Sequence, residues 1–197
     1  MKTQFTLAAL ATLILTGVSA RAGLEPPSPG AAIPDGNLSG ITFGQTLSDY
    51  ASQATVSIVT VALNIAGGYD GNLYSYLVAP NGTMVVLLTP TANSGSGMNI
   101  TLQDNATAIN ASSDLSSGTY AASGTLANIN GSAANGQWTL FVADEVTGGG
   151  TSTLNSWSLD ITAVPEPVNV ALGVFGGVMG LIALARSKPV KRLLGEI

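Results

Sequence analysis

Five residues with oxygen-bearing side chains stand where the sequence predicts strand ends or turns. They are Asp35, Asp70, Asn72, Asp144 and Glu145. Calcium takes six to eight oxygen ligands from carboxylates, amides and backbone carbonyls, so a cluster of such residues at one end of a fold would suit it. The residues that we assign to an expected calcium site are Asp35, Asp70, Asn72 and Asp144. The alternative is that they are solvated turn residues, because Asp and Asn favour turns for backbone reasons.

Acid–base catalysis has few groups available in this chain. The sequence contains neither histidine nor cysteine, which excludes an imidazole base, a thiolate nucleophile and a disulfide. The acid–base groups that remain for catalysis are carboxylates, which glycosidases use in pairs. Asp144 and Glu145 suit it poorly, because adjacent residues of a strand point to opposite faces of a sheet. We therefore expect no enzyme, and a carboxylate-based hydrolase is the third hypothesis for function.

Charge is segregated along the chain. The six cationic residues all lie near its two ends: Lys2, Arg21, Arg186, Lys188, Lys191 and Arg192. Ten of the eleven acidic residues lie between them, in a body that has no Lys, Arg or His. Such a body cannot neutralise phosphates, so no nucleic acid is expected as a partner. A bound metal ion would neutralise clustered acids, which agrees with the expected calcium site.

Alternating apolar residues predict the strands that would position these groups. The segments "TVSIVTVALNI", "WTLFVAD" and "WSLDI" each place every second residue on one apolar face. "LYSYLVA" and "MVVLLT" flank the turn "PNGT", and Asn-Gly between apolar strands is a strong hairpin signal. From residue 92 to 136 only "GMNITLQD" and "GTYAASGTL" suggest short strands, and the rest reads as loop.

These strands predict an all-β fold, an antiparallel two-sheet sandwich over residues 33–163. Trp138 and Trp157 lie on the apolar faces of their strands. Burying a large apolar side chain contributes roughly 1.5–3 kcal/mol, so both are assigned to the core rather than to sugar stacking.

Targeting segments are predicted at both ends. Residues 1–22 have a positive start, an apolar run and small residues, the pattern of a secretory signal peptide cleaved after Ala20 or Ala22. A proline-rich extended spacer, 23–32, follows. Residues 168–185 are uncharged and are followed by a basic tail, 186–197. That arrangement predicts a membrane-spanning helix with the body outside and the tail in the cytoplasm.

The C-terminal segment 164–197 resembles a known sorting signal. "VPEP", an apolar helix and a basic tail together are similar to the PEP-CTERM signal of exopolysaccharide-associated Gram-negative bacteria. The resemblance implies an exosortase-like transpeptidase and the secretion machinery as partners, with Pro165, Glu166 and Pro167 as the recognition motif. It also implies export to the cell surface or extracellular matrix, with residues 168–185 as a temporary anchor.

The body resembles a second family. "IPDGNLSG", "VTVALNIAGGYDGNLYSYLVAPNGTMVVLL" and "NGQWTLFVADEVTGGGTSTLNSWSLDI" are similar to the P domain (Homo B domain) of proprotein convertases and bacterial subtilases. The resemblance implies a jelly-roll sandwich of eight or nine strands, which in proteases folds against the catalytic domain and stabilises it. Some P domains bind calcium, although Asn72 stands where the family often has Asp.

The leading hypothesis is therefore an exported, non-catalytic surface or matrix module. Its role would be structural or adhesive, through contacts with exopolysaccharide or a surface protein. The second hypothesis is a P domain that stabilises a secreted protease in trans.

Overall fold

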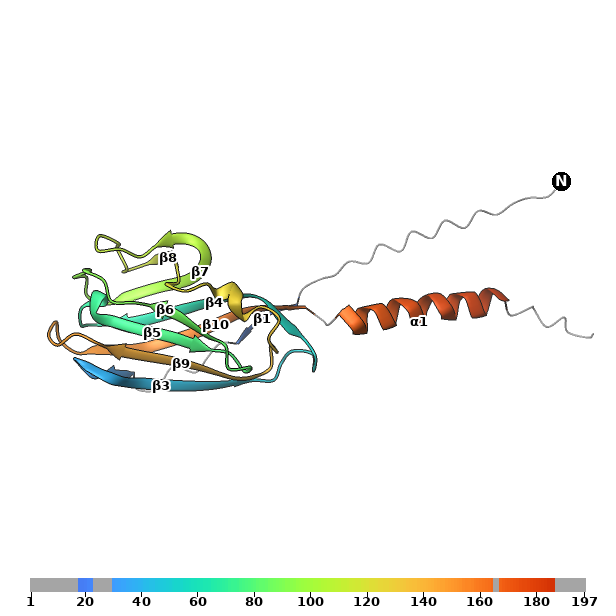
Figure 1. The fold of residues 1–197 in the computed structure, drawn as a ribbon, viewed down its shortest axis with the longest axis horizontal. Helices are drawn as coiled ribbons and strands as arrows, with labels where there is room; N and C mark the ends of the chain where they lie inside the picture. Colours follow the sequence, from blue (N-terminus) through green and yellow to red (C-terminus); the bar gives the residue numbers. More distant parts are fainter. Residues whose placement is uncertain (1–17, 23–29, 165–166, 187–197) are drawn as a thin grey trace, which may run out of the picture.

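The computed structural model describes residues 18–22, 30–164 and 167–186, and it places their strands in two sheets packed face to face (Figure 1). Sheet A has the order β1-β10-β4-β7-β8, with β2 also paired to β10, and sheet B has the order β3-β9-β5-β6. The strands of sheet A are β1 (Val18–Ala22), β2 (Ala31–Ile33), β4 (Thr55–Ala66), β7 (Met98–Ala108), β8 (Gly118–Ala121) and β10 (Ser152–Val164). Those of sheet B are β3 (Asn37–Leu47), β5 (Leu73–Val78), β6 (Met84–Leu88) and β9 (Gly136–Asp144). The predicted two-sheet β-sandwich is confirmed.

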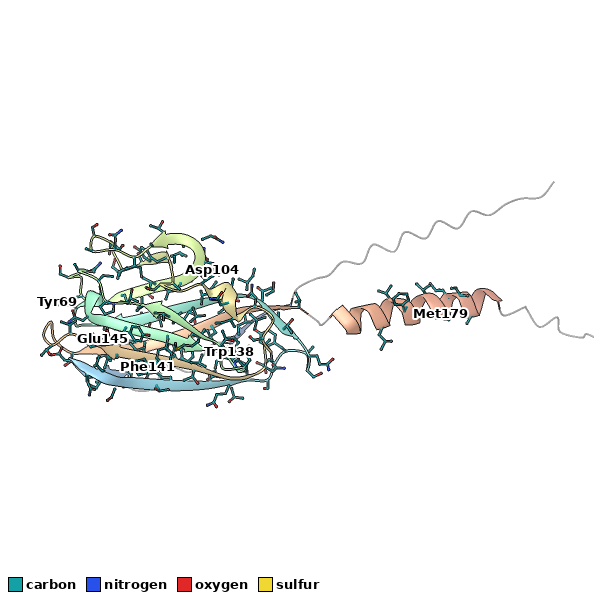
Figure 2. All side chains as sticks on the ribbon, in the orientation of Figure 1. Tyr69, Asp104, Trp138, Phe141, Glu145 and Met179 are labelled. Atoms are coloured by element: carbon teal, nitrogen blue, oxygen red, sulfur yellow. The ribbon has the colours of Figure 1, made fainter. Side chains whose placement is uncertain are left out.

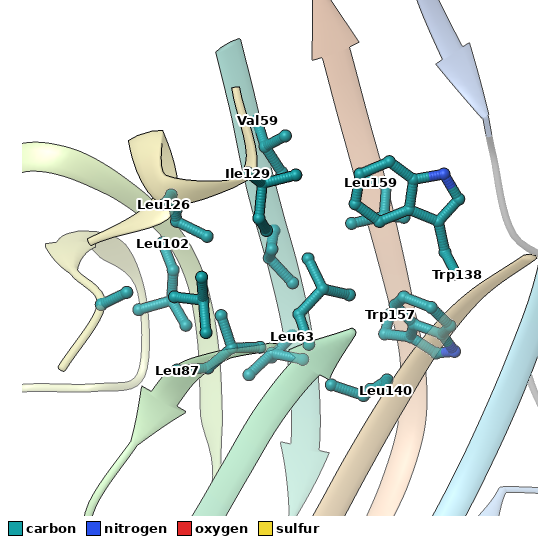
Figure 3. Close-up of a cluster of buried hydrophobic side chains, with 14 of the residues drawn as sticks. Val59, Leu63, Leu87, Leu102, Leu126, Ile129, Trp138, Leu140, Trp157 and Leu159 are labelled. Carbon is teal, nitrogen blue, oxygen red and sulfur yellow. The ribbon is translucent and has the colours of Figure 1, made fainter. Parts of the chain in front are cut away.

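The core lies between the two sheets, and β4, β5, β6, β7, β9 and β10 supply most of its apolar side chains (Figure 3). Trp138 and Trp157 are 0% and 4% exposed, and the indole Nε1 of Trp138 donates to the backbone carbonyl of Ala134 at 3.2 Å. The indole therefore has a partner for its polar atom inside the core. Both tryptophans are core residues, as predicted, and neither is available to stack on a sugar.

The β5–β6 hairpin forms at the predicted Asn-Gly turn. Gly82 has φ +84°, and the amide of Thr83 donates to Oδ1 of Asn81 at 3.0 Å. The amide of Ala79 closes the turn on the carbonyl of Thr83 at 2.9 Å. A left-handed glycine next to an asparagine side chain that bonds its own turn is the chemistry that this dipeptide favours.

Strand β8 corrects the prediction of a fully antiparallel sandwich. It pairs with β7 in parallel, with Ile100 opposite Gly118 and Leu102 opposite Tyr120. The loop between them carries the chain back to the start of β7, where the amide of Asn99 donates to the carbonyl of Leu115 at 2.9 Å. Side-chain alternation does not encode strand direction, which is why the sequence missed the parallel pair.

Two short strands precede the expected start of the domain. β2 pairs with the beginning of β10 and β1 with its end. β1 comprises the last five residues of the expected signal peptide, and it was missed because its small residues were assigned to the cleavage region of that peptide. Residues 1–17 of that expected peptide, and 23–29 of the expected spacer, lie outside the described residues.

The C-terminal segment forms the expected helix, α1 (Pro167–Arg186). Pro165, Glu166 and the tail 187–197 lie outside the described residues, and Pro167 begins the helix. A membrane span needs about 20 consecutive apolar residues. Within the described part of the chain no helix is long and apolar enough to cross a membrane. The structure thus confirms the helix and does not support the predicted span.

Candidate functional site

Three aromatic side chains gather on the outer face of sheet B, and we call them the aromatic face. Tyr74 and Tyr76 come from β5 and Phe141 from β9, and each is half-buried. Tyr76 lies directly opposite Phe141 in the register, and their rings stack with centroids 4.7 Å apart and planes 14° apart. Tyr74 meets both rings edge-on, at 6.1 and 6.4 Å. The arrangement is a stacked pair of rings with a third ring packed edge-on beside it.

Strand β3 makes room for the aromatic face through an irregularity. The register between β3 and β9 shifts between Asn37 and Ile41, and Gly40 lies in the shift with φ +51°. A Cβ atom on Gly40 would meet the ring of Phe141 at 2.6 Å and would also run into the carbonyl oxygen of Val142. Glycine at this position therefore lets the Phe141 ring lie over the neighbouring strand.

The outer face of sheet A has a different character. Thr60 and Asn64 of β4, Thr101 of β7 and Ser158 of β10 lie there, with Ile58 as an exposed apolar exception. The outward residues next to the aromatic face are uncharged: Thr42, Val78, Val86, Gln137 and Thr139. One outer face is thus small and polar, and the other is aromatic and uncharged. Figure 2 labels Phe141 on β9.

The acidic residues lie at the ends of strands, as predicted. Asp144 ends β9 and is fully buried, and its Oδ1 accepts from the amide of Val146 at 3.1 Å. Asp35 accepts from the amide of Gly148 with both oxygens, at 3.0 and 3.1 Å. Nδ2 of Asn72 donates to the carbonyls of Val146 and Gly148, at 3.0 and 2.9 Å. Asp35, Asn72 and Asp144 therefore share one loop, 145–148.

Asp70 lies apart from the 145–148 loop. It lines a hollow of about 370 Å³ between the loops 93–97 and 111–116. Asn93 ties these loops together, because its Nδ2 donates to the carbonyls of Asn110 and Ser113 at 3.2 and 2.9 Å. The four residues assigned to one calcium site thus divide into a group of three and a separate Asp70. Glu145 is exposed beside Asp144.

Two buried carboxylate oxygens have no hydrogen-bond partner, Oδ1 of Asp70 and Oδ2 of Asp144. Burial raises the pKa of both carboxyls, and the charge of Asp35 adds to the rise at Asp144. Hydrogen bonds from backbone amides, Gly97 to Asp70 and Val146 to Asp144, oppose the rise. Among the described residues, no group of three or more acidic side chains is placed to hold a metal ion.

The family model of the proprotein convertase P-domain matches residues 56–161, from β4 to β10. The chain belongs to the proprotein convertase P-domain family. The P domain is a non-catalytic domain, which confirms the expectation that this chain is not an enzyme. The matched region includes Tyr74, Tyr76 and Phe141.

Two solved structures from Aeromonas sobria are similar to this P domain. A serine protease in complex with its chaperone matches 76% of this chain and 26% of that chain, with 18% identity and a TM-score of 0.48. The serine protease itself matches over 73% and 26%, with 19% identity and a TM-score of 0.46. The P domain thus spans about a quarter of each matched chain. No curated protein matches it.

The aromatic face was not predicted from the sequence. Its signal was present in "LYSYLV", where Tyr74 and Tyr76 occupy the positions that alternate with the core residues of β5. The third ring, Phe141, comes from a strand 65 positions later, and only the pairing of β5 with β9 brings it alongside.

Proposed function

We propose that this P domain is an exported, non-catalytic binding module whose aromatic face docks onto a secreted protease and stabilises it in trans. Family membership supports the proposal, because the family takes its name from convertases. The observation that carries it is the half-exposed cluster of Tyr74, Tyr76 and Phe141 on one outer face.

The physical reason lies in what the rings would gain from a partner. Aromatic residues are enriched in protein interfaces, and the well-packed centre of an interface carries most of the binding energy. The aromatic face is already assembled by ring–ring contacts, so docking would cost little side-chain entropy. The neighbouring uncharged side chains would not need to give up strongly bound water.

The test uses the double variant Tyr76→Ser with Phe141→Ser. The secreted serine proteases of the host are purified and heated with and without the P domain, and the half-life of activity and co-elution are measured. We expect the wild-type domain to co-elute with one protease and to lengthen its half-life, and the double variant to do neither. The matched control is Asn99→Ser with Thr101→Ser, on the outer face of sheet A, which should behave as wild type. Equal protection by both double variants would reject the aromatic face.

A second candidate ligand is a matrix polysaccharide. The stacked rings of Tyr76 and Phe141, with Thr139 and Gln137 on the same outer face, would offer apolar surface and hydrogen-bonding groups to a sugar ring. Retardation of the domain in gels containing purified polysaccharide measures this binding. Retardation that is lost in the Tyr76→Ser, Phe141→Ser variant, without any effect on a protease, would favour the surface-module hypothesis.

Export and sorting are proposals that rest on the sequence. We propose that the chain is exported through the inner membrane to the cell surface or matrix. An exosortase-like transpeptidase would act at Pro165, Glu166 and Pro167. The mass of the protein recovered from cells and medium tests this, because sorting predicts loss of the segment after the motif. An intact C-terminus in the mature protein would contradict it.

Calcium binding is proposed for a smaller site than the sequence suggested. Asp35 and Asp144 would supply carboxylates on the 145–148 loop, and the unpartnered Oδ2 of Asp144 is the observation that favours it. Asp70 does not belong to this site. Thermal unfolding with calcium or with a chelator tests the proposal, since a ligand that binds only the folded state raises the midpoint. An unchanged midpoint would contradict it.

A further inference from the structure

The outer edge of β10 is covered by two separate short strands. β2 pairs with residues 152–154 and β1 with residues 159–163, while β4 covers the other edge along nearly the whole strand. In the described part of the chain, β1 is therefore the strand that satisfies the outer backbone groups of β10 over its last residues.

Strand β1 coincides with the predicted cleavage region. Cleavage after Ala22 would remove all of β1, and cleavage after Ala20 would remove three of its five residues. Either cut would leave a row of unpaired N–H and C=O groups at the edge of sheet A. Natural edge strands are often protected by Lys or Pro, and residues 159–163 contain neither.

Contacts other than those with β1 should hold β10 in its conformation when β1 is absent. It remains paired with β4, and Leu159 and Ile161 are buried in the core. The hydroxyl of Tyr50 also donates to the carbonyl of Ile161 at 3.0 Å. The edge would therefore be ordered in advance, which lowers the entropic cost of adding a strand.

We propose that removal of β1 opens a strand-acceptor site along residues 159–163, and that this site binds an extended segment of a partner protein in antiparallel orientation. In such β-augmentation, main-chain hydrogen bonds supply affinity and the alternate side chains supply specificity. The register of β1 indicates the sequence that fits. Ala20 and Ala22 lie opposite the inward residues Ile161 and Leu159, and Arg21 lies opposite Asp160.

Charge complementarity defines the partner further. Residues 22–185 contain no Lys, Arg or His. In the register of β1, the residue opposite Asp160 is the cationic Arg21, which lies outside this region. The partner segment should carry Lys or Arg at this position, between small residues. The site is on sheet A and does not rest on the aromatic face of sheet B.

The test uses the protein secreted by its host, with its N-terminus defined by mass, and the unprocessed full chain. The probe is a fluorescein-labelled synthetic peptide with the sequence of residues 16–24. We expect the secreted form to bind the peptide saturably in fluorescence anisotropy, with slower hydrogen exchange at the amides of residues 159–163. The unprocessed chain should bind at least tenfold more weakly, because β1 occupies its edge.

Two altered peptides control for sequence without changing the protein. Arg21→Glu should weaken binding to the secreted form at least tenfold, and much less in an Asp160→Asn protein. Ser19→Pro with Ala20→Pro should abolish binding, because one of two adjacent amides must donate to β10.

Three results would overturn the proposal. The secreted form could retain all of β1. It could fail to bind the peptide, or it could form a dimer in which the 159–163 amides are already protected. In the last case a second copy, and not a partner protein, closes the edge. Failure of the wild-type domain to protect any protease would leave this proposal standing and would reject only the proposed role of the aromatic face.

Discussion

Buried carboxylates without partners are the most unusual residues of this P domain. Asp144 is fully buried and Asp70 is 6% exposed, yet each has an oxygen without a hydrogen-bond partner. Burying a charge without full compensation is costly, and a group can respond by keeping its proton. The raised pKa of both carboxyls is the expected electrostatic consequence.

This electrostatic state predicts a pH dependence of stability. Between the unfolded pKa of 3.8 and the raised pKa in the fold, the folded state binds more protons than the unfolded state. The contribution of Asp144 to the free energy of unfolding therefore falls as pH rises through this window. In Asp144→Asn this contribution is absent, so the unfolding free energy should fall less steeply with pH than in the wild type. Urea titrations from pH 4 to 7 with a chelator measure both slopes, and parallel slopes would contradict the prediction.

The tryptophan with a hydrogen-bonded indole predicts a second residue-level effect. Trp138→Phe removes buried volume and leaves the carbonyl of Ala134 without its donor. We expect a loss of about 2–4 kcal/mol in the free energy of unfolding. Tyr69→Phe, at a side chain that is 45% exposed, is the control and should change it by less than about 0.5 kcal/mol. Denaturant unfolding measures both, and a loss at Trp138 as small as at Tyr69 would argue against a packed indole.

At the scale of elements, Gly40 links the bulge in β3 to the aromatic face. Gly40→Ala combines a left-handed φ with contacts to the Phe141 ring and the Val142 carbonyl. Gly82→Ala has the same sign of φ but nothing within 4 Å of the new Cβ. We expect Gly82→Ala to cost about 1–2 kcal/mol, the backbone term alone, and Gly40→Ala to cost clearly more. Equal costs in denaturant unfolding would mean that the bulge relaxes without disturbing Phe141.

The strands show how far local pattern can predict an element. β4, β9 and β10 carry their own alternation, so the sequence predicts which residues they bury. β1 is short and its small residues were assigned to the signal peptide, and β8 pairs with its partner in parallel against expectation. Both lie at or near the edge of sheet A, where a strand is defined more by its neighbour than by its own residues.

At the scale of the whole molecule, the described side chains of α1 contribute nothing to the core of the sandwich. Its described side chains, residues 172–183, are all exposed, and Leu172 and Phe175 are about 70% exposed. We expect deletion of residues 165–197 to leave the midpoint of thermal unfolding within about 1 °C, since none of the described side chains of this segment belongs to the core. The deletion should also raise solubility, because apolar surface is removed. Calorimetry in matched detergent tests this, and a fall of several degrees would show that the helix packs on the sandwich.

Four features could be predicted from the sequence: the class of fold, the core faces of the long strands, the β5–β6 turn and the burial of both tryptophans. These depend on periodicity and on turn chemistry within a few residues, which a single segment contains. Which residues distant in the sequence come into contact depends on the tertiary structure. It stacked Phe141 on Tyr76, separated Asp70 from Asp144, and placed Asp104 to accept from the amides of Leu126 and Ala127 at 2.8 and 2.7 Å. Strand order and register determine these long-range contacts, and the alternation of residues within one strand specifies neither.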